Sequence, residues 1–211
     1  MESFLACLAE YIWQNPVREY FYQYIRNNCL LNGKECEAAA QKAFSIALGL
    51  RPGCDVIFEK LKEYFGEGHS CITIEGFLRF RMKELRLDLN ALADLCADEL
   101  TAKREYEDFI ALLRGFVDIQ KPGFDEIHFV ASENGEHHIL DNRGEDITLK
   151  YMDDFTGHPD ADTTVDDIII SSLVSLAPRR IFLHNEKNSA NPQLLETITS
   201  IFAGRVILCS N

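Results

Sequence analysis

The sequence RIFLHNEKNSANPQLLETITSIFAGRVILC, residues 180–209, decides how the C-terminal part of this chain folds. It begins with a strand-like run, Arg180–His184, and ends with a second one, Arg205–Cys209. Between the two runs, Pro192 opens a helical pattern that Gly204 closes, because proline suits the first turn of a helix and glycine its end. Two strands that are joined through a helix lie parallel in one sheet. The segment therefore predicts a parallel strand–helix–strand unit.

Upstream of this unit, the chain from Gly123 onward also follows strand patterns. Glu126–Ala131 predicts a first strand, and Asn134-Gly135 is a strong turn signal that leads into a second strand at His137–Leu140. These two strands form a predicted β-hairpin, after which the chain turns again towards Ile147–Lys150.

A helix is predicted between the hairpin and the strand–helix–strand unit, from about Val165 to Leu176. Thr163 or Thr164 caps it, and the acidic residues that follow favour the positive end of a helix. The loop at residues 160–166 begins like a calcium loop, but it lacks the glycine at the sixth position and the acid at the twelfth that such a loop needs. Helix capping therefore explains these acids, and we expect no metal site here.

Before Gly123, apolar side chains recur every three or four residues, as they do on one face of a helix. The predicted helices lie around Leu8, after Pro16, at about 34–48, 54–65 and 73–100, and around residue 113. We therefore predict an α+β fold. A helical region of about five or six helices at residues 1–121 precedes a small mixed α/β domain at residues 122–211, which holds the β-hairpin and the strand–helix–strand unit.

The composition is that of a globular protein with an acidic surface. Of 211 residues, 46% are hydrophobic and 26% are charged, and 21 lysines and arginines stand against 34 aspartates and glutamates, which gives a net charge of −13. Such a surface repels phosphate backbones and anionic lipid headgroups, so we expect no nucleic acid partner and no membrane partner. The most continuous apolar stretch, residues 168–177, is too short to span a bilayer, which takes about 20 residues.

The start of the chain and its cysteines indicate a cytoplasmic protein. Residues 1–6 lack the basic region of a signal peptide, and Glu10 interrupts the apolar run that follows. The seven cysteines are odd in number, and no two of them form a C-x-x-C pair. Without an export signal, the expected state is reduced thiols in the cytosol.

Five phrases of the sequence, in their order along the chain, resemble one protein family. They are EGFLRFRMKEL (75–85), KREYEDFIALLRGFVDIQKP (103–122), EIHFV (126–130), ISSLVSLAPRRIFLH (170–184) and TITSIFAGRVILC (197–209). Together they are similar to the YtxC-like sporulation proteins of endospore-forming bacteria, over about two-thirds of the chain from Thr73 to its end. The resemblance implies an association with sporulation. It implies no established activity and no catalytic residues.

The run RFRMKELR, residues 79–86, is a candidate binding site because it mixes basic and aromatic side chains, which can bind nucleic acid or another anion. On a helical wheel, however, Arg79, Lys83 and Arg86 lie opposite the apolar side chains. Glu75 precedes Arg79 by one turn, in the order that favours a local ion pair. We interpret the run as the solvated face of an amphipathic helix. An anion site, and a surface for a partner helix or an acidic partner, are the alternatives.

Three charges stand on the apolar side of the same predicted helix: Arg81, Asp88 and Glu99. A charge that faces a core must be paired, because an isolated one is very costly to bury. One interpretation is a buried ion network that locks the long helix to its neighbour. The other is that this side is a polar groove or a protein interface, with the three residues as its binding residues.

The ends of the predicted strands offer a candidate catalytic site. In open parallel sheets, ligands sit at the carboxyl ends of strands. His184 and Cys209 end neighbouring parallel strands, and Asp141 follows an earlier one. A cysteine and a histidine so placed can form a nucleophile–base pair or two metal ligands, whereas a structural histidine with a buried cysteine is the simpler alternative. His137 and His138 point to opposite faces of their strand, so we do not expect them to chelate together.

The sequence contains no P-loop, G-x-G-x-x-G, G-x-S-x-G or H-E-x-x-H motif, and we expect no cofactor and no resident metal. Whether the chain is an enzyme stays open, with a non-catalytic role favoured. We expect a cytosolic interaction or scaffold protein of sporulation with a protein partner, because catalytic motifs are missing and the first helices are rich in aromatic residues, including Trp13, Tyr20, Tyr22 and Tyr24. The alternatives are an enzyme or small-ligand binder at the strand ends, and a nucleic-acid binder through residues 79–86.

Overall fold

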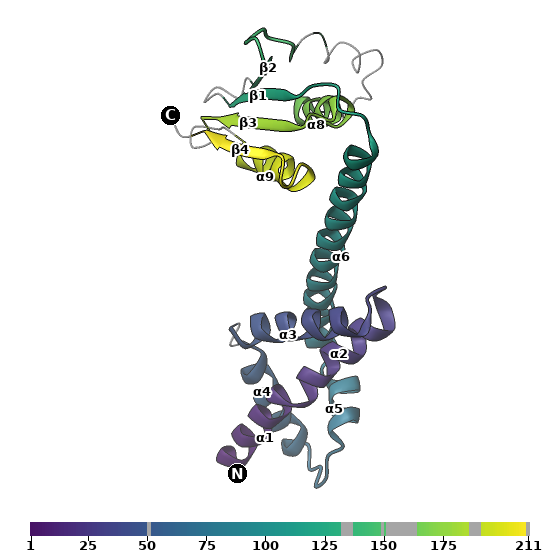
Figure 1. Cartoon of the computed structure of the whole chain (residues 1–211). Coiled ribbons are helices and arrows are strands. Elements are labelled where there is room, and N and C mark those ends of the chain that lie inside the picture. The colour runs from purple at the N-terminus through teal and green to yellow at the C-terminus, as the bar shows by residue number, and fades with distance from the viewer. Residues whose placement is uncertain (50–51, 132–136, 149, 151–163, 186–190, 210–211) are drawn as a thin grey trace. The chain divides into compact units, whose positions relative to one another are not determined.

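The structure is a computed structural model of the whole chain (Figure 1), and it describes residues 1–49, 52–131, 137–148, 150, 164–185 and 191–209. Helices followed by a small mixed sheet confirm the predicted α+β class. The elements in chain order are α1 (Glu2–Gln14), α2 (Pro16–Asn28), α3 (Gly33–Gly49), α4 (Pro52–Gly66), α5 (Ile74–Arg81), α6 (Lys83–Ile119), β1 (Glu126–Ala131), β2 (His137–Asp141), α8 (Val165–Leu176), β3 (Arg180–His184), α9 (Pro192–Ile201) and β4 (Val206–Cys209).

The chain forms two compact units, residues 1–105 (unit 1) and residues 106–211 (unit 2), and the division between them falls within α6. Each unit has its own cluster of buried apolar side chains. The domain boundary that the sequence suggests after residue 121 stays a prediction. Among the described residues, no helix is both long enough and apolar enough to cross a bilayer.

Unit 1 is built from α1 to α5 and the first part of α6. The apolar positions that recur every third or fourth residue form its core, in which Ile12, Phe21 and Ile57 have no exposed surface. Pro16 is the first residue of α2, as predicted, because a helix needs no N–H group there. α3 packs against α2 and turns a row of small side chains inward, namely Ala39, Ala40, Ala43 and Ala47.

The helix predicted at residues 73–100 is interrupted at Met82, whose φ of −114° and ψ of 38° separate α5 from α6. At 100° per residue, Phe77 and Leu89 would face directions about 120° apart on one straight helix. Both side chains are buried in the structure, as is Met82 itself. The break therefore lets α5 and α6 each turn its own apolar side into the core of unit 1.

α6 runs without interruption from Lys83 to Ile119, so the prediction of two separate helices, one ending near Leu100 and one around residue 113, is wrong. Residues 100–106 contain neither glycine nor proline, and nothing in this stretch stops a helix. The spacing of apolar residues changes in this stretch, but the backbone stays helical through it.

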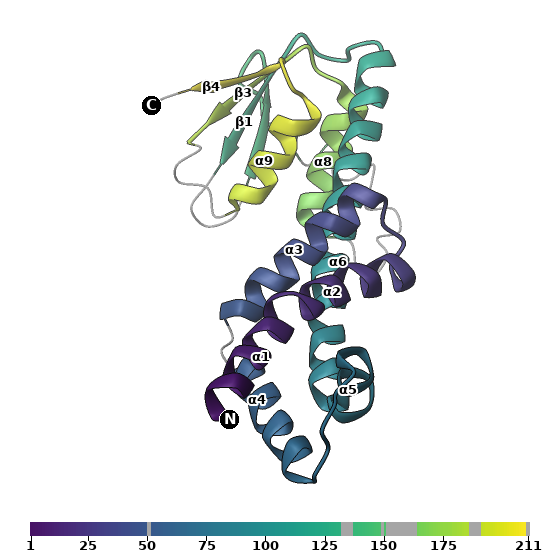
Figure 2. The same cartoon turned by 90° about the horizontal axis from the view of Figure 1, so that it is seen from below.

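Unit 2 contains a four-stranded sheet in the order β2-β1-β3-β4. β1 pairs antiparallel with β2, as the predicted hairpin requires, and β3–β4 is a parallel pair, as the strand–helix–strand pattern predicts. β1 and β3 form a second parallel pair. After the hairpin of β1 and β2, the chain passes through α8 to β3, on the other side of β1 from β2, and then through α9 to β4. Both helices lie on the same face of the sheet (Figure 2), where their buried side chains join those of β1 and β3 in one cluster.

The two faces of the sheet differ in burial. Alternate side chains of β1 and β3, such as Phe129 and Leu183, are buried in the cluster that α8 and α9 complete. The side chains between them in the sequence, such as His128 and His184, point to the opposite face and are half-buried or exposed. We call this side the open face. The register places its residues in two rows across the sheet: Leu140, His128, Phe182 and Ile207 in one, and His138, Val130, His184 and Cys209 in the other.

The helix caps of unit 2 follow from the sequence. The Thr164 hydroxyl accepts the N–H of Asp167, and the Asp167 carboxylate accepts the N–H of Thr164, which is a capping box at the start of α8. The Thr164 hydroxyl also donates to the Asp167 carboxylate at 2.7 Å, and this hydrogen bond, followed by the one from the backbone N–H of Thr164, holds the pKa of Asp167 below its usual value. The turn predicted at Asn134-Gly135 and the loop at residues 160–163 lie outside the described residues.

Candidate functional site

His184 and Cys209 lie side by side at the carboxyl ends of β3 and β4. The two residues are opposite each other in the parallel pairing of β3 with β4, so both side chains belong to the open face of the sheet. Both residues are half-buried. The structure thus brings together two of the three residues of the strand-end candidate.

Asp141, the third residue of that candidate, lies elsewhere and has a structural role. β2 runs antiparallel to β1, so Asp141 lies beside Ile127, at the start of β1 and at the opposite end of the sheet from His184. Its Oδ1 accepts hydrogen bonds from the N–H of Arg143 at 2.8 Å and of Glu145 at 2.9 Å, which closes the turn after β2. The structure therefore does not bring Asp141 to the strand-end site.

The partner that the structure gives to His184 is His128 of β1. Nδ1 of His128 lies 2.9 Å from Nε2 of His184, and the two rings stack with their centroids 5.2 Å apart. His128 also stacks on Phe182, at 4.9 Å between centroids. Burial, and then the charge that His128 carries when protonated, lower the pKa of His184. The neutral ring is therefore favoured, and one N–H···N hydrogen bond can join the pair.

The two histidines at the start of β2 lie on opposite faces, as predicted. His137 is buried, its Nδ1 has no hydrogen-bond partner among the described residues, and burial lowers its pKa. His138 lies on the open face, where its Nδ1 is 2.8 Å from the carboxylate of Asp146. In the part of the chain that the structure describes, no group of three or more histidine, cysteine, aspartate or glutamate residues is placed to hold a metal ion.

Arg81, Asp88 and Glu99 do not form a common network in the structure. All three are exposed. Arg81 lies 2.9 Å from the carboxylate of Glu67, and Glu99 pairs with Lys42. The sequence prediction places all three residues on one side of a single helix. Because the helix breaks at Met82, Arg81 belongs to α5 and the other two residues belong to α6, so their directions cannot be compared on one helical wheel. The buried ion network is thus not found, and the interface role of these residues stays a prediction.

Three other cations gather where α5 meets α6, and we call Arg79, Lys83 and Arg86 the basic surface. The expected ion pair between Glu75 and Arg79 is not formed. None of the three cations makes an ion pair with any residue that the structure describes. The guanidinium of Arg79 instead lies over the ring of Phe80, at 5.6 Å from its centroid.

An apolar groove of about 520 Å³ adjoins the basic surface. It lies between α2 on one side and α5 with the start of α6 on the other, and we call it the α2–α5 groove. Its apolar lining comes from both sides: Val17, Tyr20, Ile74, Leu78, Leu85 and Leu89.

Tyr20 fixes one wall of this groove. Its hydroxyl donates a hydrogen bond to Oδ1 of Asn90 on α6, and its ring lies under the guanidinium of Arg86, at 5.5 Å from that group. One turn later, the Tyr24 hydroxyl donates to Asp94 at 3.1 Å, and burial and then this hydrogen bond raise the pKa of Tyr24. The sequence singles out both tyrosines as aromatic residues. It gives no local signal for their partners on α6, which lie 70 positions away.

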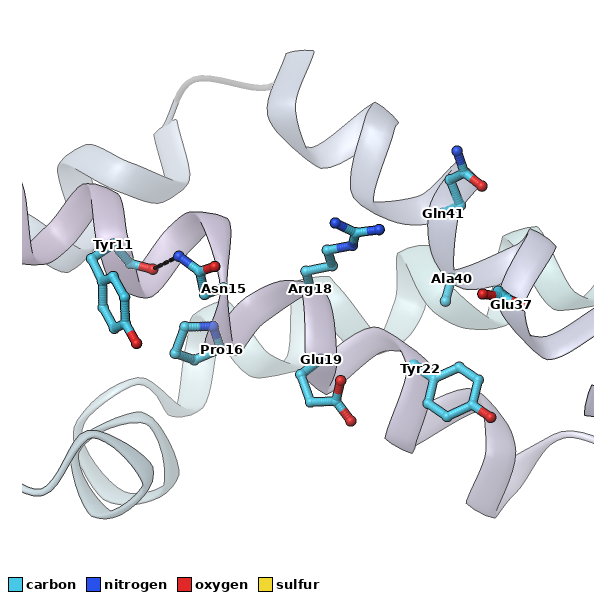
Figure 3. Close-up of a pocket in the computed structure, with 9 residues that line it drawn as sticks. All are labelled: Tyr11, Asn15, Pro16, Arg18, Glu19, Tyr22, Glu37, Ala40 and Gln41. Atoms are coloured by element: carbon cyan, nitrogen blue, oxygen red, sulfur yellow. Dashed lines mark hydrogen bonds between the residues drawn. The ribbon is translucent and has the colours of Figure 1, made fainter.

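A second, more polar groove of about 670 Å³ lies along α2 and α3 (Figure 3). Its lining includes Arg18, Glu19 and Glu37, so charges of both signs face it. Among the residues drawn in Figure 3, the side-chain amide of Asn15 donates to the carbonyl of Tyr11 at 3.2 Å. This mixed lining favours no single class of ligand.

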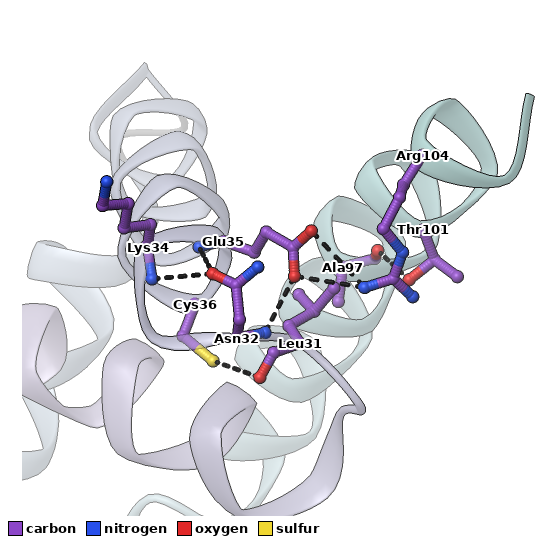
Figure 4. A network of polar contacts seen from close by, with 8 residues as sticks. All are labelled: Leu31, Asn32, Lys34, Glu35, Cys36, Ala97, Thr101 and Arg104. Atoms are coloured by element: carbon purple, nitrogen blue, oxygen red, sulfur yellow. Dashed lines mark hydrogen bonds and ion pairs between the residues drawn. The ribbon is translucent and has the colours of Figure 1, made fainter. Parts of the chain in front are cut away.

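A polar network at the start of α3 ties α6 to the rest of unit 1 (Figure 4). Oδ1 of Asn32 accepts the N–H groups of Lys34 and Glu35, and the Glu35 carboxylate accepts the N–H of Asn32, which is a capping box. The same carboxylate accepts two hydrogen bonds from the guanidinium of Arg104 on α6, at 3.2 and 3.4 Å. One glutamate thus caps α3 and holds α6.

Comparison with known proteins extends the family match over nearly the whole chain. The model of the YtxC-like family matches residues 2–207, which include the N-terminal helices. A relative from Bacillus subtilis (strain 168), named "Uncharacterized protein YtxC", is 27% identical over 137 residues, which are 63% of this chain and 46% of that protein. The match therefore spans less than half the length of the relative. No solved structure matches the chain significantly. This chain belongs to the YtxC-like family.

Proposed function

We propose that this protein is a non-catalytic interaction or scaffold protein of the cytosol, that it acts in sporulation, and that it binds a protein partner through the α2–α5 groove. The observation that carries the proposal is the groove itself. Leu78 and Ile74 line it and are only half-buried. Apolar side chains that stay in contact with water in a groove favour the approach of another apolar surface.

Two more apolar side chains support a protein partner. Phe80 and Leu87 are 66% and 67% exposed, and they lie beside the basic surface. Aromatic and arginine side chains are enriched where protein interfaces have their strongest contacts. The apolar contact area therefore extends beyond the groove, which suits a protein better than a small molecule.

The remaining parts of the proposal have separate support. The association with sporulation rests on the resemblance to the YtxC-like sporulation proteins. The cytosolic location is supported by the cysteines, since all seven are free, which suits a reducing compartment.

The proposal is tested by crosslinking in sporulating cells. A photo-reactive amino acid replaces Leu78 in the groove of the full chain, or Leu95, which is 63% exposed on α6 and does not line the groove. We expect a discrete crosslinked protein from the Leu78 position and none from the Leu95 position. Recovery of only the monomer from both positions would contradict the proposed function.

A second function, small-ligand binding or catalysis on the open face, is favoured by one observation. His184 is bonded to His128 and registered with Cys209. The test is complementation of a sporulation defect in a host that lacks its own YtxC-like protein. A Cys209→Ala variant that folds but does not restore sporulation would favour this second function over the first.

A further inference from the structure

The basic surface gathers three cations without an ion pair to any described residue in one depression of an acidic protein. The chain carries a net charge of −13, yet Arg79, Lys83 and Arg86 meet no carboxylate among the described residues. Elsewhere in unit 1, Arg81 pairs with Glu67. Ion pairing within the chain therefore does not account for these three positions. The Arg86 guanidinium donates to the Tyr20 hydroxyl and to the Arg79 carbonyl, both at 3.5 Å, and its charge, like those of Arg79 and Lys83, stays without a carboxylate partner among the described residues.

The basic surface and the α2–α5 groove are continuous. A shallow depression of about 470 Å³ holds the three cations together with Phe80 and Leu87, and it shares Arg79 and Arg86 with the groove. On α5 and the start of α6, the groove lining extends from Ile74 to Leu89, and the three cations lie within the same stretch. A bound segment would meet apolar side chains and cations along one track.

We infer that the α2–α5 groove and the basic surface together bind an acidic amphipathic helix of a partner protein. This inference rests on the proposed function and names the chemistry of its partner. Apolar side chains spaced by three or four residues on such a helix would enter a groove that helices border. Glutamates or aspartates on its flank would reach Arg79, Lys83 and Arg86, and the planar guanidinium groups can bind a carboxylate with two hydrogen bonds.

A nucleic acid fits this surface less well than an acidic helix. A phosphate backbone would pair with the cations but would leave the apolar lining of the groove in water. Glu19 and Glu75 also line the groove and would repel phosphates. Glu75 lies one turn before Arg79, at the start of α5, so the two carboxylates favour a partner whose acids cluster on the side of the basic surface.

The test uses the full chain and three fluorescent peptides of about 18 residues, or five helical turns. The first has a leucine stripe flanked by glutamates. The second carries lysines in place of the glutamates. The third has the composition of the first, with its leucines scattered so that no stripe forms. In fluorescence anisotropy we expect the first peptide to bind at least about tenfold more tightly than the other two, and to weaken as salt rises.

Charge reversal then locates the binding. The double variant Arg79→Glu and Lys83→Glu is expected to weaken binding of the first peptide about tenfold, or about 1.4 kcal/mol. A matched control reverses Arg26 and Lys34, two exposed cations of unit 1 that do not line the groove. This control makes the same change in net charge, and we expect it to bind the peptide as the unaltered chain does. Circular dichroism confirms that both variants fold.

Several outcomes would overturn the inference. Equal binding of the acidic and the lysine peptides would do so, as would equal losses in the two double variants. A single-stranded oligonucleotide that displaces the acidic peptide and binds more tightly would assign the surface to nucleic acid. A protein crosslinked at Leu78 together with no preference for the acidic peptide overturns the inference alone, whereas no crosslinked protein contradicts the proposed function itself.

Discussion

His128 and His184 are diagonal neighbours on the parallel strands β1 and β3, with Nδ1 of the His128 ring 2.9 Å from Nε2 of the His184 ring. A single proton between two imidazoles makes a hydrogen bond, whereas two protonated rings at this distance repel each other. The hydrogen-bonded pair is therefore more stable when neither imidazole ring carries an extra proton. Burial acts in the same direction at His184 and at His137, since it lowers the pKa of both.

The stability of unit 2 is therefore expected to fall as the pH is lowered from about 7.5 to 5. An unfolded histidine titrates near pH 6.5, and the folded state holds His184 and His137 at lower pKa values, so the unfolded chain binds more protons in this range. The stabilisation is complete above the unfolded pKa and is lost progressively as the pH falls from the unfolded pKa to the lower pKa of the folded state. The protection factors of the β1 and β3 amides, which are exchange rates corrected for the intrinsic dependence of exchange on pH, measure the effect.

The matched variants for this experiment are His184→Phe and His69→Phe. The first removes a titrating ring from the sheet, and we expect it to flatten the dependence of the protection factors on pH. The second changes an exposed histidine of unit 1, and we expect it to leave that dependence unchanged. The explanation fails if His184→Phe keeps the full slope.

Gly53→Ala is expected to destabilise unit 1 by about 1–3 kcal/mol, as overpacking of a core does. A Cβ at this position would lie 2.1 Å from Cη2 of Trp13, and the buried indole ring has little room to move. Trp13 is the single tryptophan of the chain, so its fluorescence during urea unfolding reports on this contact directly.

Gly66→Ala is the control in the same helix. A Cβ on Gly66 meets nothing within 4 Å. Alanine replaces a poor helix former there, and we expect a gain between zero and about 1 kcal/mol. Equal changes in stability for the two variants would show that the contact with Trp13 is not the cause.

The sequence predicts elements well where local chemistry sets their ends. Thr164 and the Leu176–Pro178 boundary define α8, and alternation defines β1 and β3, so these elements begin and end where expected. The break at Met82 is a different case. It depends on where two apolar faces meet one core, which is a tertiary requirement, and residue preferences around Met82 do not reveal it.

The candidate sites show the same division. The register of a strand–helix–strand unit is enough to place Cys209 beside His184. The pairing of His128 with His184 needs the order of the strands in the sheet, because the two residues are 56 positions apart. The α2–α5 groove depends likewise on Tyr20 reaching Asn90, a contact between helices that no local pattern predicts.

Asn32→Ala is expected to cost unit 1 about 1 kcal/mol, within the range of about 0.5–2 kcal/mol for a lost N-cap. The substitution removes the side-chain acceptor for two N–H groups at the start of α3, whereas the backbone N–H of residue 32 can still donate to the Glu35 carboxylate. Urea unfolding measures the change. Asn27→Ala, at an exposed position in α2, should stay within about 0.5 kcal/mol of the unaltered chain, and a similar loss there would refute the role of the cap.

Alkylation of the native protein tests whether Cys209 is an activated nucleophile. Thiolates react, so accessible thiols react first and buried ones last. Cys7 and Cys71 are exposed, whereas Cys96 is 1% exposed and burial raises its pKa. With iodoacetamide at pH 7.5 and peptide mass spectrometry, we expect Cys7 and Cys71 to react at least about tenfold faster than Cys96, and the half-buried Cys209 to react no faster than Cys7. In urea the rates should become equal. A Cys209 that reacts before both exposed cysteines would be a thiolate activated by its surroundings, and the open face would then be the better candidate for the functional site.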